Sequence, residues 1–262
     1  MLNRFLRLFG GSSPHNTVRP KPLLILGMHR SGTSCLAGML RDAGVFMGEV
    51  SEANAYNRKG NLEGEATRIN NAILSRLDAD WQVPVIWTGE AVEQSAIGQL
   101  VLELASGAER EQSLFWGVKD PRMLFCLRAW EPYLDDVQYV GTFRSPARVR
   151  QSILARQKKS LLPRVDPIEI WTAYNKRLLD LHKQEQFPIV NFDWPAETYR
   201  STVASICDGL SLDGAACEFF TEQLVHQSDP VDDVGAEAAT LYGELSEIAD
   251  ANRAAVAARD SA

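Results

Sequence analysis

The stretch from residue 23 to 40, LLILGMHRSGTSCLAGML, combines residue types that can hold an anion. Its four leading branched apolar residues predict a strand buried on both faces, and Gly27 then permits a tight turn. A helix is expected to begin near Gly32, because apolar residues recur behind it at helical spacing. A strand, a glycine-containing loop and a helix N-terminus direct backbone N–H groups and the positive end of the helix dipole at one point. The sequence therefore predicts an anion-binding loop with Arg30 as its cation.

The spacing of Gly27 and Gly32 matches the P-loop pattern GxxxxGK[ST], but Thr33 stands where that pattern requires lysine. A nucleoside triphosphatase uses that lysine on the β- and γ-phosphates, whereas the cation of this loop is Arg30. A different phosphate ester is therefore favoured. A kinase or NTPase with the same kind of fold is the enzymatic alternative, and a glycine-rich turn that binds nothing is the simplest one.

A second basic segment, FRSPARVRQSILAR, follows the strand predicted at residues 137–143. Arg144 leaves the end of that strand, and Ser152 stands about two turns into the next helix, with Arg148 one turn earlier on the same face. A forked contact from the arginine and a hydroxyl from the serine can hold one dianionic phosphate. Taken alone, the segment also fits a solvated basic helix face.

The pattern [KR]SGT[TS] directly after a parallel strand resembles the 5′-phosphosulfate loop of sulfotransferases that use 3′-phosphoadenosine 5′-phosphosulfate (PAPS). The Arg144 and Ser152 pair looks like the 3′-phosphate-binding element of the same family, and Lys119, Asp120 and Pro121 match its KDP segment. The resemblance covers about residues 22–156. It is strongest for bacterial members carrying GMHRSGTS and for the carbohydrate and tyrosylprotein types, whereas the RKGxxGDW motif of the small-phenol enzymes is missing.

The resemblance implies PAPS as co-substrate, adenosine 3′,5′-bisphosphate as product and no required metal. The acceptor would be a hydroxyl or amine on a carbohydrate, a lipid or a small molecule. A non-catalytic nucleotide-binding adaptor is the alternative that is not an enzyme. The residues implied to bind the donor are His29, Arg30, Ser31, Gly32, Thr33, Ser34, Arg144 and Ser152.

Four residues are candidates for catalysis. The resemblance places Lys119 near the bridging oxygen of the donor, with an ion pair to a neighbouring loop carboxylate as the alternative. Arg30 would stabilise the leaving phosphate. The favoured base for the acceptor proton is Glu63 in NRKGNLEGE, and the second choice is Glu49 in MGEV. His29 could act on the acceptor, but a packing or orienting role is favoured.

Strand and helix patterns alternate along the chain and predict a three-layer α/β/α fold with a central parallel sheet. In such a sheet ligands bind at the carboxyl ends of the strands, which is where all the candidate cations fall. A functional loop is expected at 44–64. The further strands are predicted at 115–118, 137–143 and 187–192, and the further helices at 65–77, 90–105, from 121 past 130, from 146 with Ser145 as N-cap, and at 167–185.

With 262 residues, 45% of them apolar, the chain suits one α/β domain at 21–228, after a leader at 1–20 and before an acidic, Ala-rich helical tail at 229–262. The formal charge of −7 and the lack of a basic stripe argue against nucleic-acid binding. No apolar run reaches the roughly 20 residues of a membrane span, so a soluble, cytoplasmic protein is expected. The leader is predicted to fray or to touch a membrane surface weakly. The four cysteines show no zinc spacing and are expected to be buried thiols.

Overall fold

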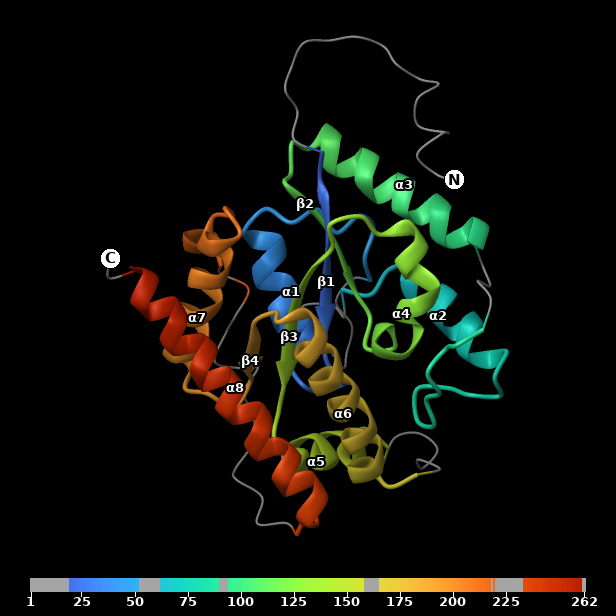
Figure 1. Ribbon diagram of the computed structural model, residues 1–262, viewed down its shortest axis with the longest axis vertical. Helices are drawn as coiled ribbons and strands as arrows, with labels where there is room; N and C mark the ends of the chain where they lie inside the picture. The colour runs from blue at the N-terminus through green and yellow to red at the C-terminus, as the bar shows by residue number, and fades with distance from the viewer. Residues whose placement is uncertain are drawn as a thin grey trace.

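Four parallel strands form the centre of the protein, in the order β2-β1-β3-β4 (Figure 1). The computed structural model describes residues 19–51, 62–89, 94–157, 165–217, 219 and 233–260. The register pairs Ile25 of β1 with Lys119 of β2 and Val140 of β3, so the carboxyl ends of neighbouring strands share one edge of the sheet. The strands are β1 (Lys21–Leu26), β2 (Phe115–Lys119), β3 (Gln138–Phe143) and β4 (Ile189–Asn191).

The last four side chains of β1, Leu23 to Leu26, alternate between the two faces of the sheet and are fully buried on both. Leu24 and Leu26 belong to one apolar cluster, and Leu23 and Ile25 belong to the other. A strand covered on both faces reads as a continuous apolar run, which explains the LLIL pattern. The predicted three-layer α/β/α architecture with a parallel sheet is confirmed.

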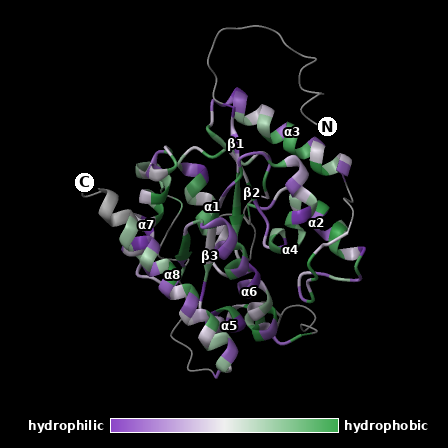
Figure 2. Ribbon diagram, viewed as in Figure 1, coloured by the Kyte–Doolittle hydropathy of each residue, from purple (hydrophilic) through white to green (hydrophobic). Residues whose placement is uncertain are grey.

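The helices divide between these two clusters. In Figure 2 the central strands and α1 carry mainly hydrophobic residues, whereas α8 carries both kinds along its length. Buried residues of α1 (Thr33–Asp42) and α7 (Ala196–Gly209) belong to the cluster around Leu23. The cluster around Leu24 contains buried residues of the other helices: α2 (Glu65–Ser75), α3 (Gln94–Arg110), α4 (Met123–Trp130), α5 (Pro146–Gln157), α6 (Pro167–Glu185) and α8 (Ala236–Asp260).

Two predicted elements differ from those observed by three or more residues. Helix α3 continues to Arg110, five residues past the predicted end, and residues 90–93 lie outside the described part. Strand β4 covers only 189–191 of the predicted 187–192. Pro188 has no N–H to donate to a ladder, and the chain turns after β4 where the Asn191 side chain accepts a hydrogen bond from the Asp193 N–H at 2.9 Å.

The predicted loop at 44–64 begins as an extension of the sheet. Phe46 forms a parallel bridge with Trp116, and the Gly117 N–H donates a hydrogen bond of 2.8 Å to the Phe46 carbonyl oxygen. The Ser51 N–H donates to the Glu63 carbonyl oxygen at 2.9 Å, so the two ends of the loop lie together. Residues 52–61, most of the predicted leader and the boundary predicted at 228 lie outside the described residues. Within the predicted tail, Leu245 of α8 is fully buried in the main core.

Candidate active site

The loop after β1 has an unusual backbone that is pressed against β3 and β4. Gly27, Arg30 and Gly32 have positive φ angles of 147°, 67° and 87°. A Cβ atom at Gly27 would lie 2.3 Å from the Thr142 carbonyl oxygen, and one at Gly32 would lie 2.4 Å from the Phe192 ring. The Thr142 hydroxyl also donates to the Ser31 carbonyl oxygen at 3.1 Å. Glycine is therefore required at both ends of this loop.

Helix α1 starts directly behind the loop with an open N-terminus. Gly32 occupies the N-cap position, and no side chain makes a capping hydrogen bond there. The first amides of a helix have no intrahelical acceptor and carry the positive end of the helix dipole. Ser31 is fully buried, and its hydroxyl oxygen has no hydrogen-bond partner among the described residues. The loop and helix together have the chemistry of a phosphate-binding site.

Arg30 reaches from this loop to the helix that follows β3. Its Nε donates a hydrogen bond of 2.8 Å to the Ser152 hydroxyl, across 122 residues of sequence. Ser152 lies on α5 and is 7% exposed. The structure thus brings the two predicted anion-binding segments into direct contact.

Arg144, the other predicted phosphate contact, pairs with a carboxylate. Its Nε lies 3.3 Å from Asp193 Oδ1, and Nη1 of Arg148 lies 2.8 Å from the same oxygen. The Ser145 N–H also donates to Asp193. Burial lowers the pKa of Arg144, and the Asp193 carboxylate opposes that shift. Asp193 therefore holds both arginines at the end of β3.

Phe192 and Asp193 were missed at the sequence level. The Phe192 ring packs where a side chain at Gly32 would stand, and Cζ of Arg144 lies 5.4 Å from its centroid. The signal that could have found them is their place at the end of the fourth predicted strand, 187–192: Phe192 is its last residue and Asp193 directly follows it, so the strand-end rule applies as it did elsewhere.

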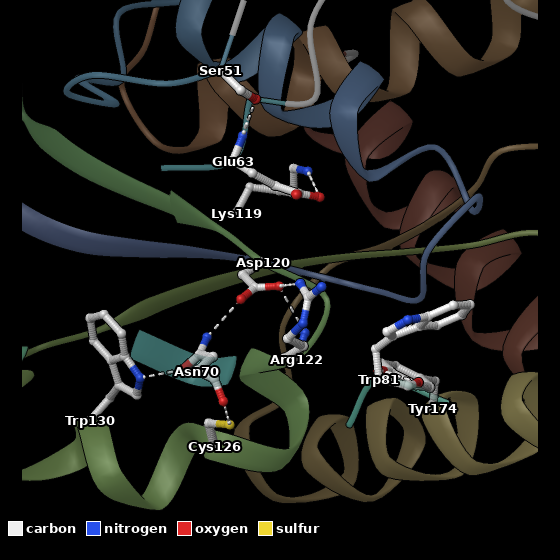
Figure 3. A network of polar contacts seen from close by, with 10 residues as sticks. All are labelled: Ser51, Glu63, Asn70, Trp81, Lys119, Asp120, Arg122, Cys126, Trp130 and Tyr174. Carbon is white, nitrogen blue, oxygen red and sulfur yellow. Dashed lines mark hydrogen bonds and ion pairs between the residues drawn. The ribbon is translucent and has the colours of Figure 1, made fainter. Parts of the chain in front are cut away.

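Lys119 and Glu63 form an ion pair near the end of β2, with Nζ and Oε1 3.1 Å apart (Figure 3). The Lys119 side chain is 1% exposed and that of Glu63 is 23% exposed. Burial lowers the pKa of Lys119, and the Glu63 carboxylate opposes the shift. Ser51 orients Glu63, because its hydroxyl accepts the Glu63 N–H at 3.4 Å. The favoured base and the predicted lysine are therefore in contact, as the ion-pair alternative for Lys119 anticipated.

Glu49, the second candidate base, lies on the neighbouring segment. A Cβ atom at Gly64 would be 2.9 Å from the Glu49 carbonyl oxygen, so the two candidate bases come from adjoining stretches of chain. The residue is exposed, and it lines a pocket together with Lys119. Glu63 is the candidate that the structure shows in contact with the lysine.

A buried polar network holds the turn that follows Lys119. Asp120 is fully buried and accepts hydrogen bonds from Asn70 Nδ2 at 2.9 Å and from Arg122 Nη1 at 2.7 Å (Figure 3). The Trp130 indole N–H donates to Asn70 Oδ1 at 2.8 Å, which orients the amide. These contacts tie the end of β2 to α2 and α4.

His29 packs in an aromatic group beside the loop. Its ring centroid lies 5.1 Å from that of Trp81 and 5.9 Å from that of Tyr174, both edge to face. The Tyr174 hydroxyl donates to the Trp81 carbonyl oxygen at 3.1 Å. This environment suits the packing role favoured for His29.

The described residues, 19–51, 62–89, 94–157, 165–217, 219 and 233–260, show neither a metal-binding cluster nor a membrane-spanning helix. They contain no group of three or more His, Cys, Asp or Glu side chains arranged to hold a metal ion. None of their helices combines the length and the apolar content that crossing a bilayer requires.

Comparison with known proteins identifies the fold. No protein-family model matches the sequence, and no curated protein matches it. The sulfotransferase domain of the Synechococcus PCC 7002 olefin synthase aligns over 90% of this chain and 98% of that domain, with 18% identity and a TM-score of 0.54. Sulfotransferase STF1 of Mycobacterium tuberculosis H37Rv aligns over 93% of this chain and 77% of its own length, with 14% identity and a TM-score of 0.38. The first likeness shows that the chain has a sulfotransferase fold, as the sequence predicted.

Proposed function

We propose that the protein is a sulfotransferase that moves a sulfuryl group from PAPS to a hydroxyl or amine of a carbohydrate, lipid or small-molecule acceptor. The observation that carries this proposal is the 2.8 Å contact between Arg30 and Ser152. It joins a phosphate-binding loop to a second predicted phosphate site. A donor with a phosphosulfate at one end of its ribose and a phosphate at another needs two such sites close together.

The charges at this edge of the sheet fit such a donor. Arg144 and Arg148 lie together at the end of β3, and Lys119 lies at the end of β2, the strand on the other side of β1. Arg30 lies on the loop that follows β1. In this assignment Arg144 and Ser152 bind the 3′-phosphate, and residues 29–34 bind the 5′-phosphosulfate. Arginine and hydroxyl groups with helix-terminal amides form strong charge-assisted hydrogen bonds to phosphate oxygens.

Bound PAPS supplies a sulfuryl group on a phosphate leaving group. An acceptor oxygen or nitrogen forms a bond to sulfur while the bond from sulfur to the bridging oxygen breaks, and that electron pair stays on the phosphate. Arg30 and the amides at the start of α1 stabilise the resulting charge. The loop also orients the phosphate for in-line transfer. The acceptor proton must leave during the same reaction.

Glu63 accepts that proton, and Lys119 provides the positive charge next to it. The ion pair holds the Glu63 carboxylate at the end of β2, and the Ser51 hydroxyl accepts a hydrogen bond from the Glu63 backbone N–H. In this proposal Lys119 shares its N–H donors between Glu63 and the leaving phosphate oxygen. Glu49 stays the alternative base, since it adjoins the same pocket.

Labelled PAPS and a panel of acceptors test the proposal. The unmodified protein should transfer labelled sulfate to at least one acceptor and should bind adenosine 3′,5′-bisphosphate. Arg30→Ala should lose transfer, whereas Arg128→Ala, at an exposed arginine on α4, should not. Glu63→Gln should lower the rate by about 10²–10⁴-fold, the usual contribution of a general base, and leave nucleotide binding intact at neutral pH.

The same incubations separate the alternatives. A kinase or NTPase would instead bind Mg-ATP and transfer or release labelled phosphate from it. An adaptor would bind adenosine 3′,5′-bisphosphate without turning over any acceptor. Either result would overturn the proposal.

A further inference from the structure

A pocket of about 350 Å³ lies beside Lys119, between β2 and the chain that borders it. Its walls come from segment 46–50, the start of α2, the middle of α3 and the last residues of β2. Lys119 belongs to the lining, and so do Leu62 and Gly64, the two neighbours of Glu63 in sequence, so the pocket lies beside the Lys119–Glu63 ion pair. Sites for small molecules usually measure about 300–1,000 Å³, and this pocket is near the lower limit.

The part of the wall around Met47, Leu62 and Leu104 is apolar and closely packed. Met47 and Leu104 are each 6% exposed, and Leu62 is 1% exposed. A Cβ atom at Gly117 would lie 2.6 Å from Met47 Sδ, and one at Gly48 would lie 2.7 Å from Leu104 Cδ2. Because the walls already touch at these glycines, the pocket has little room to widen without repacking. An occupant must therefore be small, and the part of it that contacts these side chains should be apolar.

The charged groups of the lining are mostly carboxylates. Glu65 pairs with Arg68, and Glu103 accepts a hydrogen bond of 3.1 Å from Gln99. No described residue forms an ion pair with the Glu49 carboxylate. The lining has two basic residues, Lys119 and Arg110. Lys119 already pairs with Glu63, so Arg110 is the basic residue that could face an anionic group of the occupant. This balance disfavours an anionic occupant.

We infer that this pocket binds the acceptor, and that the acceptor is a small alcohol, phenol or amine with a mostly apolar body and no negative charge. The inference rests on the proposed function and narrows it to small-molecule acceptors. An acceptor in the pocket has its hydroxyl or amine at the Lys119–Glu63 end, where Glu63 takes the proton. A sugar chain would leave many hydroxyls unpaired against the apolar walls.

Two tryptophan substitutions on α3 test the position of the site. Leu100 is half-buried and lines the pocket, whereas Leu102, on the same helix, is 53% exposed and does not line it. The ligands are small aryl alcohols and aryl amines, together with the corresponding aryl carboxylates and simple sugars. Binding is measured by NMR on the full chain saturated with adenosine 3′,5′-bisphosphate. The kcat/KM for labelled sulfate transfer is measured in parallel.

The alcohols and amines should bind, and the carboxylates and sugars should not. Leu100→Trp should weaken alcohol binding and lower kcat/KM by about tenfold or more, since pocket-filling changes of this size discriminate at that level. Leu102→Trp should match the unmodified protein, and neither change should alter the affinity for adenosine 3′,5′-bisphosphate. Glu103→Lys should lower the preference for amines over carboxylates and provides a second variant that need not disturb packing.

The results distinguish this inference from the proposed function. If adenosine 3′,5′-bisphosphate binds but the alcohols and amines do not, or if Leu100→Trp leaves their binding unchanged, the pocket is not the acceptor site and the inference is overturned. Preferred binding of sugars or carboxylates overturns it as well. Failure to bind adenosine 3′,5′-bisphosphate at all overturns the proposed function and this inference with it.

Discussion

Arg30 Nε lies 2.8 Å from the hydroxyl oxygen of Ser152, so the loop after β1 and the helix after β3 meet directly. Neither residue is close to the other in sequence, and each belongs to a segment with its own phosphate-binding pattern. The contact makes the two segments parts of one site. It also predicts that they act together on one ligand.

Arg30 and Ser152 should be energetically coupled in binding adenosine 3′,5′-bisphosphate. Hydrogen bonds that involve a charged group contribute about 1.5–3 kcal/mol, so Arg30→Ala should weaken binding by about 10- to 100-fold. Ser152→Ala should cost less, and the double variant less than the sum of the two, because each single change also removes the contact between them. Isothermal titration calorimetry on the four proteins measures the coupling. Strict additivity would show that the two residues contact the ligand independently.

Gly32→Ala should damage both folding and nucleotide binding. The new Cβ atom would lie 2.4 Å from the Phe192 ring at a φ of 87°, a backbone region that costs a non-glycine residue about 1–3 kcal/mol. Gly209→Ala is the matched control, since nothing lies within 4 Å of a Cβ atom there. Urea unfolding and calorimetric binding of adenosine 3′,5′-bisphosphate should show losses for the first variant alone. Equal behaviour of the two would mean that the loop is not tightly held by Phe192.

Asp120→Asn should be strongly destabilising, because it leaves the Arg122 guanidinium buried beside a neutral amide. Breaking one side of a buried ion pair usually costs about 3–5 kcal/mol. Asp250→Asn makes the same chemical change in the exposed pair with Arg253 and should cost about 0–1 kcal/mol. Denaturant unfolding of the two variants gives the comparison. A loss below 1 kcal/mol at Asp120 would contradict the assignment of this network as a support for the end of β2.

Nucleotide binding should weaken at alkaline pH as Lys119 loses its charge. Burial lowers the pKa of this lysine, so the loss should come at a lower pH than for an exposed lysine. The Glu63 carboxylate raises the pKa of Lys119 and so opposes the effect of burial. Glu63→Gln should therefore make the alkaline loss of nucleotide binding begin at a still lower pH. Lys119→Arg should move this loss of binding to a higher pH, because a guanidinium stays charged. Affinity for adenosine 3′,5′-bisphosphate across pH in the three proteins tests this order. An unchanged alkaline loss in Lys119→Arg would show that another group titrates.

Much of the site follows from local pattern. The run LLIL, the glycines at 27 and 32 and the helical spacing behind them predict strand, loop and helix α1, because each depends on short-range sterics and on burial. The strand-end rule then places Lys119 and Arg144 at the same edge as Arg30. For the same reason the three-layer fold could be predicted before any contact was known.

The partners of these residues could not be predicted in this way. Glu63 and Lys119 are 56 residues apart in sequence. The NRKGNLEGE segment indicated the glutamate as a candidate base but did not indicate its partner. Asp193 was overlooked, although it holds both Arg144 and Arg148. A helix face or a strand end specifies where a side chain begins but not which neighbour it meets.

The sequence by itself determined the loop between Gly27 and Gly32, the elements around it and the edge of the sheet where the cations lie, because these depend on neighbours within a few residues. Only the tertiary structure decided that Arg30 meets Ser152, that Glu63 pairs with Lys119, and that a partly apolar pocket lies beside that pair. Those relationships depend on the strand order, on the register of the sheet and on the path of the chain beside β2, all of which are set by packing between segments far apart in sequence.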